Sequence, residues 1–358
     1  MTLRRILWAL LALLVLAAAG AYLMRAPLSV ALATRLAAAR LAADPIAELP
    51  DGLHVGTCGA GSPFPDDRRS GPCTLVIAGK RVFVFDAGSG AVRNLGKMGV
   101  NHGRIEAIFL THLHSDHIDG LGELLLQRWV AGGNPAPVPV HGPAGVDVVV
   151  GGLMQAYAPD RQYRVAHHGE AVVPPGGFGG HAHPFEVGPD DAVVLLKDGD
   201  LEIAAFGVDH SPVKPAAGYR IRYKDRSAVL SGDTRKSASV QREAAGADLL
   251  VHEALSAPLV GVLQEGAQRA GRPNLVRIFA DVIDYHTSPE QAAEIARDAK
   301  VRFLLLNHVV PPLPLPGMEK AFLAGAADVF SGPIRVAADG DLVSLPAGSR
   351  EVSASRRF

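Results

Sequence analysis

The chain has 358 residues, 48% of them hydrophobic, and a formal net charge of −1. This length is enough to bury one large core or two medium ones, and the composition excludes a disordered chain. The near-zero charge gives no electrostatic case for a nucleic-acid partner, which we expect to leave a basic footprint. Two cysteines are too few for a disulfide scaffold or a structural zinc module.

The N-terminal segment Ile6–Met24 is apolar throughout and has arginines on both sides. As a helix, its 19 residues would span roughly 28 Å, close to the roughly 30 Å of a bilayer core. We therefore expect residues 1–25 to anchor the chain in a bacterial-type inner membrane. The alternative is a signal peptide cleaved near Ala17–Ala19, which would release a secreted protein. Either interpretation exports the rest of the chain to the periplasm, because Arg4 and Arg5 should stay cytoplasmic.

Three further segments follow the anchor. Residues 26–52 have a helical rhythm and predict a juxtamembrane helix or linker, residues 53–345 a folded domain, and residues 346–358 a C-terminal tail. The domain opens with short strands over 53–57, 74–78 and 81–85, which are rich in β-branched and aromatic residues. Cys58 and Cys73 lie in this stretch. Outside the cytoplasm they are free to pair, and two buried thiols are the alternative.

A dense group of metal-ligand residue types follows the apolar run Ile105–Leu110. We expect this run to be a buried strand and Leu121–Val130 to be a helix. The turn between them carries His112, His114, Asp116 and His117. The first two are two residues apart and point the same way on an extended backbone, while the last two reach the opposite side. The turn therefore predicts a site for one or two metal ions.

Residues 138–200 are expected to form supporting structure and to supply none of the metal ligands or catalytic residues. Val138–Val140 reads as a short strand, placed at a sheet edge because Pro139 cannot donate to a neighbouring strand. Val146–Tyr157 reads as a helix, and His141 as a strand-to-turn position. Residues 159–200 are rich in Gly and Pro and predict a loop-rich insertion that covers the site.

In the second half, polar residues again appear where apolar strands stop. The strands are expected over 201–207, 218–221, 227–230, 248–251 and 303–307, and the second and third of these form a hairpin. The polar residues that follow them are His210, Asp233, His252, Glu253 and His308. Strand ends are where a rigid scaffold presents its chemistry. Two runs of alternating strands and helices, before and after residue 200, predict an α/β fold built as a four-layer αββα sandwich.

The turn motif His-x-His-x-Asp-His at residues 112–117 resembles the signature of the metallo-β-lactamase superfamily of hydrolases. The order of Asp209-His210, Gly218-Tyr-Arg-Ile, Ser231-Gly-Asp-Thr, His252-Glu-Ala, His286-Thr-Ser and His308 resembles its ribonuclease Z branch. The glycine-rich opening, with Asp86-Ala-Gly-Ser-Gly90, resembles ribonuclease Z-like and arylsulfatase-like members. The resemblance implies the superfamily fold over residues 53–345.

The resemblance also implies a two-metal site. His112, His114 and His210 are expected to hold one ion, Asp116, His117 and His308 the other, and Asp233 to bridge them. Asp86 and His252 are expected to support the ligands from behind. The ions are expected to be Zn²⁺, with Mn²⁺ or iron as alternatives, and to share a hydroxide that attacks the substrate. His286 is then the general acid, and Glu253 orients it or relays its proton; Asp116 is counted with these as catalytic.

Two departures from the ribonuclease Z pattern lead to a substrate expectation. Only the residues between Ile221 and Ser231 are available for the long arm that grips transfer RNA, and the export signal separates the domain from that substrate. We therefore expect a phosphodiesterase that acts on a small extracytoplasmic molecule, with no nucleic-acid partner; a homodimer is one option for its assembly. The alternatives are an arylsulfatase-like enzyme, a lactonase or other carboxyl-ester hydrolase, and a non-catalytic binding module tethered to the membrane.

Overall fold

The structure is a computed structural model that describes residues 2–358. The described residues divide into two compact units, one ending at Pro45 and the other spanning 46–358. The first unit is dominated by one helix, α1 (Leu3–Ala42), which contains Pro27 and buries none of its side chains. This helix is long and apolar enough to cross a membrane, with a mean hydropathy of 2.4 over its most apolar window. It covers both the expected anchor and most of the segment expected to be a linker.

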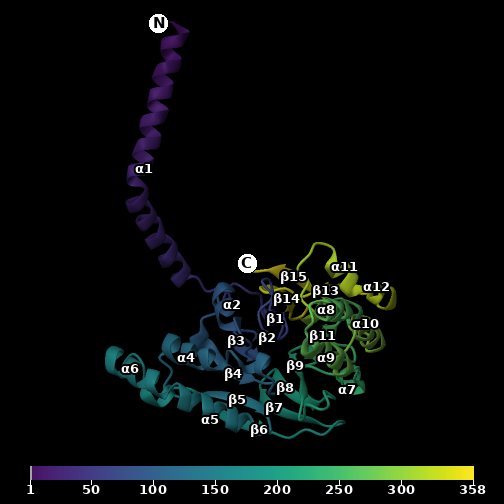
Figure 1. The fold of residues 1–358 in the computed structure, drawn as a ribbon. Coiled ribbons are helices and arrows are strands. Elements are labelled where there is room, and N and C mark those ends of the chain that lie inside the picture. The colour runs from purple at the N-terminus through teal and green to yellow at the C-terminus, as the bar shows by residue number, and fades with distance from the viewer. Residues whose placement is uncertain (1) are drawn as a thin grey trace. The chain divides into compact units, whose positions relative to one another are not determined.

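Two mixed β-sheets form the body of the second unit (Figure 1). Among residues 2–358, the first sheet has eight strands in the order β15 (Ser353–Arg356), β14 (Asp341–Pro346), β1 (Gly52–Gly59), β2 (Cys73–Ala78), β3 (Arg81–Phe85), β4 (Ile105–Phe109), β5 (Val138–Pro143) and β6 (Gly180–Phe185). The second has seven, in the order β13 (Ile334–Val336), β12 (Leu304–Val310), β11 (Leu249–Leu255), β10 (Arg226–Leu230), β9 (Ala217–Tyr223), β8 (Leu201–Gly207) and β7 (Ala192–Asp198). In each sheet, antiparallel pairs give way to parallel ones, from β3 to β6 and from β10 to β13.

α-Helices connect many of the strands in the second unit. They are α2 (Ala91–Lys97), α3 (Ser115–Ile118), α4 (Leu121–Gly132), α5 (Val146–Ala156), α6 (Ala158–His168), α7 (Ala238–Glu243), α8 (Ala257–Arg269), α9 (Pro273–Asp281), α10 (Pro289–Asp298), α11 (Met318–Leu323) and α12 (Ala326–Val329). The central core lies between the sheets, where the rings of Phe109 and Tyr219 approach to 5.7 Å between centroids. A second core joins the first sheet to α2, α4 and α5, and a third joins the other sheet to α7, α10, α11 and α12. The four-layer αββα sandwich is therefore confirmed.

Some local predictions differ from the structure. The strand at Val138 lies inside the first sheet, between β4 and β6, because a missing donor at Pro139 does not prevent pairing at its neighbours. Residues 159–200 are not a loop-rich insertion, since they contain most of α6 and the whole of β6 and β7. The segment 346–358, expected to be a tail, supplies β15 to the first sheet. Cys58 and Cys73, left open as a pair or as two thiols, form a disulfide.

Candidate metal centre

The carboxyl ends of strands from both sheets meet at one place, and seven side chains gather there. His112, His114, Asp116 and His117 follow β4, His210 follows β8, Asp233 follows β10, and His308 lies near the end of β12. Parallel strands present their carboxyl ends at the same edge, so sequence-distant loops converge. The structure thus brings together all seven residues that the sequence suggested as metal ligands.

Asp233 lies at the middle of this group. Its Oδ2 atom is 3.2 Å from His308 Nε2, 3.3 Å from His117 Nε2, 3.9 Å from His112 Nε2 and 4.0 Å from His210 Nε2. The carboxylate is buried. One oxygen surrounded by four imidazole nitrogens is an arrangement in which a single carboxylate can serve two neighbouring cations.

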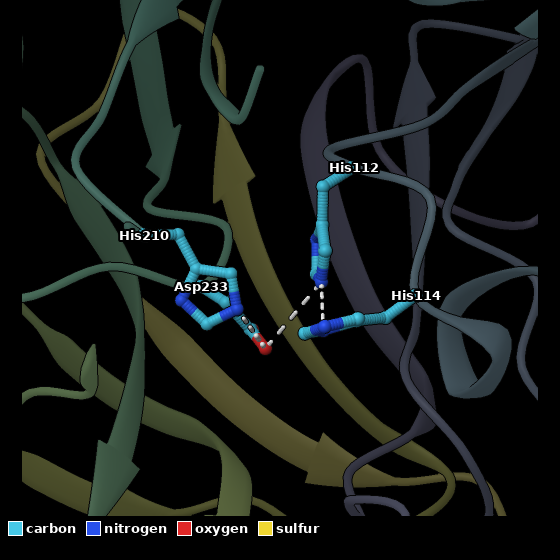
Figure 2. A group of neighbouring side chains, drawn as sticks. All are labelled: His112, His114, His210 and Asp233. Atoms are coloured by element: carbon cyan, nitrogen blue, oxygen red, sulfur yellow. Dashed lines mark hydrogen bonds and ion pairs between the residues drawn. The ribbon is translucent and has the colours of Figure 1, made fainter. Parts of the chain in front are cut away.

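The first subset of ligand atoms consists of His112, His114, His210 and Asp233, whose atoms all lie within 4.8 Å of one another. Figure 2 shows the rings of His112 and His114, from one loop, and of His210, from another, turned toward the Asp233 carboxylate. His112 Nε2 and His114 Nδ1 are 2.9 Å apart, a separation that suits two nitrogens facing one ion. On its far side, His210 Nδ1 donates to the backbone oxygen of Tyr285 at 3.0 Å, which orients the ring.

A second subset consists of Asp116, His117 and His308, again within 4.8 Å of one another. Asp116 Oδ2 is 3.3 Å from His308 Nε2 and 3.6 Å from His117 Nε2. His117 Nδ1 donates to Asp86 Oδ2 at 2.9 Å, the carboxylate–imidazole arrangement typical of metal sites. Asp86 also accepts from both the backbone nitrogen and the hydroxyl of Thr111, at 2.8 and 2.9 Å. It therefore holds the loop and one of its imidazoles together.

Close backbone packing fixes the same loop. Ala87 donates its backbone N–H to the His117 oxygen at 2.8 Å, and Gly120 donates to the Ala87 oxygen at 2.7 Å. A Cβ atom added at Gly88 would lie 2.3 Å from the Asp116 backbone oxygen. The glycine-rich sequence after Asp86 is thus required by the close approach of two backbones.

Electrostatics within the cluster also fit bound cations. Burial alone would raise the pKa of Asp233, but the surrounding imidazoles, His308 and His117 foremost, hold it well below its usual range. Burial lowers the pKa of His112 and His210, so both rings are neutral and able to donate lone pairs. Within residues 2–358, the buried Nε2 atoms of His117 and His210 have no hydrogen-bond partner. Unpartnered imidazole nitrogens around an ionised carboxylate are what a pair of divalent metal ions requires.

His286 stands beside the metal-ligand cluster. It precedes a capping box in which Ser288 accepts from the backbone of Gln291 and the Gln291 side chain accepts from the backbone of Ser288, as the sequence indicated. One of its ring nitrogens lies within 4.8 Å of the ligand atoms of Asp233 and His308. The ring also lies next to Glu253, whose Oε1 is 3.2 Å from His286 Nδ1.

Not every predicted residue joins the cluster. His252 is buried, and its Nδ1 lies 2.7 Å from the Glu253 backbone oxygen, but within residues 2–358 it belongs to none of the candidate ligand groups. The sequence reading did not single out Thr111, Tyr285 or Thr287. Thr287 donates its backbone N–H to Glu253 at 2.9 Å and thereby holds that carboxylate under His286. The only signal for these positions is that each one adjoins a predicted site residue.

An open pocket of about 400 Å³ lies next to the cluster and reaches Asp116. Its walls come mainly from the segment after β1, including Ser62 and Phe64, and from Ser89 and Gly90. The volume is in the range of ligand sites.

Comparison with known proteins identifies the class to which this fold and this cluster belong. Residues 81–309 match the family model described as the beta-lactamase superfamily domain. Among solved structures, a metallo-β-lactamase fold protein from Bacillus subtilis shares 22% identity at a TM-score of 0.58 and covers 82% of this chain and 100% of its own. Human tRNase Z, short form, shares 21% identity at a TM-score of 0.57, over 82% of this chain and 99% of its own. These two structures support the fold.

Curated relatives narrow the assignment. A ribonuclease Z of Mycolicibacterium gilvum is 40% identical over 290 residues, which are 80% of this chain and 94% of that protein. A ribonuclease Z of Mycobacterium avium is 37% identical over 299 residues, 83% of this chain and 100% of that protein. The chain therefore belongs to the metallo-β-lactamase superfamily and, within it, to the ribonuclease Z family. Membership implies divalent metal ions and hydrolysis of phosphodiester bonds.

Two expectations about the substrate are wrong. The small extracytoplasmic substrate and the exclusion of nucleic acid are both overturned by this similarity, since the relatives are ribonucleases. Net charge failed as an argument because it sums over the whole chain and says nothing about the charge near the site. The short turn between β9 and β10 was not a sound argument against a transfer-RNA substrate. One connection does not define the substrate of a domain when most of its sequence matches ribonuclease Z relatives.

Proposed function

We propose that the chain is a metal-dependent ribonuclease of the ribonuclease Z type and that precursor transfer RNA is its substrate class. One observation carries this proposal: relatives named ribonuclease Z share 37–40% of their residues with it over at least 80% of the chain. The gathering of six further ligand residues around Asp233 supports it, because such a set has little use without catalysis.

His112, His114 and His210 would hold one ion, Asp116, His117 and His308 the other, and Asp233 would contact both. Imidazole and carboxylate together suit zinc, which we propose as the resident metal. When bound, the metal ions activate water for attack on phosphorus and neutralise charge on the phosphate. Asp86 accepts the Nδ1–H of His117 and so fixes the tautomer of that ring, which leaves the lone pair on Nε2 free for a metal ion.

His286 would donate a proton to the oxygen that leaves phosphorus, and Glu253 would keep the ring charged and oriented. Burial opposes the charged ring, yet Glu253 and Asp233 raise the pKa of His286 above its usual value. A ring whose pKa is raised and which lies beside the metal ligands suits general-acid catalysis. The proton leaves from His286 as the P–O bond breaks, and the departing oxygen becomes a hydroxyl.

α1 would anchor the enzyme in a membrane through its apolar first half. Two observations point to opposite sides of the membrane for the catalytic domain. The Cys58–Cys73 disulfide is typical of an oxidising compartment, whereas a transfer-RNA substrate belongs to the cytoplasm. Treatment of intact cells with a membrane-impermeant protease, and separately with a membrane-permeant thiol reagent, distinguishes the two locations. Cleavage of the domain without thiol labelling places it outside.

The function is tested with the full chain in detergent micelles, loaded with zinc. The substrates are a precursor transfer RNA with a 3′ extension, an unstructured RNA of equal length, and p-nitrophenyl sulfate. We expect cleavage of the precursor at a single position, lost in Asp233→Asn. A sulfate ester that turns over while the precursor stays intact would overturn the proposal and favour the arylsulfatase-like alternative.

A further inference from the structure

Three histidines form a second cluster away from the metal centre, on the last two strands of the first sheet. His141 lies on β5, and His181 and His183 lie on β6. His183 is the register partner of His141. The proposed reaction uses none of the three.

The three rings share one face of the sheet. His181 and His183 are two residues apart on a strand, so they point to the same side as Phe185, which belongs to the core between the sheets. His141 stacks on Phe109 of that core, with 4.8 Å between ring centroids and 12° between planes. β6 is the edge strand, and His181 is exposed. The cluster therefore occupies the open end of the sandwich, where water and ions have access.

The geometry of His181 and His183 repeats that of the first two ligands of the metal centre. His181 Nδ1 and His183 Nε2 are 3.0 Å apart, compared with 2.9 Å between His112 Nε2 and His114 Nδ1. The ring centroids are 4.6 Å apart at 86° in the edge pair and 4.7 Å apart at 74° in the centre. Two nitrogens bound to one ion at about 2.0–2.1 Å, with 90–109° between them, lie about 2.8–3.4 Å apart. The His181–His183 pair thus has the spacing of a chelate.

Burial favours the neutral form of His141 and of His183, which is the form that binds metal. Burial, followed by His183, lowers the pKa of His141 to about 4. Burial and then His181 also lower the pKa of His183. When the pKa of an imidazole is low, protons compete little with a metal cation for its lone pair. His141 stacks on His183, with 4.9 Å between centroids and 24° between planes, and so restrains that ring.

We propose that His181 and His183 form a second, peripheral binding site for a divalent d-block cation such as Cu²⁺, Ni²⁺ or Zn²⁺. The two imidazoles supply the protein ligands, His141 positions His183, and water completes the coordination on the exposed side. The site is independent of the proposed nuclease activity, since it stands on residues that the activity does not use. Cu²⁺ is the most suitable test ion, because the 3.0 Å spacing corresponds to an angle near 90° at the metal. Neighbouring ligands lie at this angle in the square-planar geometry that Cu²⁺ prefers.

The test uses the full chain in detergent micelles with its metal centre filled by zinc. Cu²⁺ is added, unbound ions are removed, both metals are counted by mass spectrometry, and the copper is examined by electron paramagnetic resonance. We expect one Cu²⁺ per chain at constant zinc content, with hyperfine splitting from imidazole nitrogen. The double variant His181→Gln/His183→Gln should lose this ion or bind it at least tenfold more weakly.

The matched control is His167→Gln/His168→Gln on α6. That pair is exposed and its rings are 4.9 Å apart, but its two histidines are consecutive in the chain, and within residues 2–358 no short nitrogen–nitrogen contact joins them. It should bind Cu²⁺ as the unmodified chain does. An equal loss in both double variants, or none in either, would show that the 3.0 Å contact is only a hydrogen bond between neutral rings. Because the copper count does not depend on RNA cleavage, failure here leaves the proposed function standing.

Discussion

Nδ1 of His286 lies 3.2 Å from Oε1 of Glu253, and both side chains are almost fully buried. The same carboxylate oxygen accepts the backbone N–H of Thr287, so the pair is fixed from two sides. A buried imidazole next to a carboxylate is held in one orientation and favoured in its charged form. This relationship gives the proposed general acid its first two tests.

Replacement of His286 by Ala should slow cleavage of RNA by about 10²–10⁴-fold, the range of general-acid contributions. The loss on bis-p-nitrophenyl phosphate should be far smaller, because p-nitrophenolate leaves without a proton. Rates on both substrates, measured at saturating zinc, check this. Equal losses would remove the general-acid role and leave His286 as a structural or metal-binding residue.

Glu253→Gln should change the pH dependence of the reaction in a defined direction. His286 must carry its proton to act, so the rate falls as the pH rises through its pKa. Glu253 contributes to raising that pKa, and removal of its charge lowers it. The alkaline limb of kcat/KM should therefore move to lower pH in the variant. An unmoved or upward-shifted limb would contradict the pairing.

Asp86→Asn should weaken metal binding without unfolding the protein. Asn tolerates the positive φ of 57° at this position, but it lacks the charge that holds His117 Nδ1–H. Loss of such a supporting carboxylate typically costs about 10–100-fold in metal affinity. Zinc titration against a chromogenic chelator measures this, and the melting temperature of the metal-free protein serves as the control. Unchanged affinity would show that Asp86 acts on the loop alone.

The double variant Cys58→Ala/Cys73→Ala should be less stable than the oxidised chain. The bridge closes a loop with a sequence separation of 15, for which the chain-entropy estimate is about 3 kcal/mol. Urea unfolding of both proteins, with a reduced sample of the unmodified chain for comparison, provides the measurement. If reduction and replacement leave the free energy of unfolding unchanged, the bridge has no structural role.

Much of the fold and the cluster could be predicted because each signal was local. His112, His114, Asp116 and His117 occupy one short turn, Asp233 follows the apolar strand β10 closely, and His308 lies near the end of the apolar strand β12. The carboxyl ends of parallel strands meet by geometry, so residue types and strand ends indicated where the site lies. The resemblance to the ribonuclease Z branch was needed to select the seven ligands, because the strand ends also offered His252 and Glu253. The capping box at Ser288 could likewise be predicted from four consecutive residues.

The remaining features depend on contacts that sequence spacing does not encode. Pro139 suggested an edge strand, yet the edge is β6, whose Gly- and His-rich sequence gave no strand pattern. Thr287 orients Glu253 through its backbone N–H, which every residue except proline possesses. The substrate class was misjudged because it was inferred from a connection and a total charge. Neither quantity measures how closely the whole domain follows its relatives.

The last strands also have a consequence for how the domain holds together. β14 and β15 come after the second sheet in the chain but return to the first, where β14 pairs with β1. A break after Pro189, where the connection between β6 and β7 is exposed, would therefore give two interlocking fragments instead of two separable lobes. The first would carry four of the seven ligand residues and the second three. Neither fragment alone could assemble the centre, so recovery of metal binding would report reassembly of the split chain.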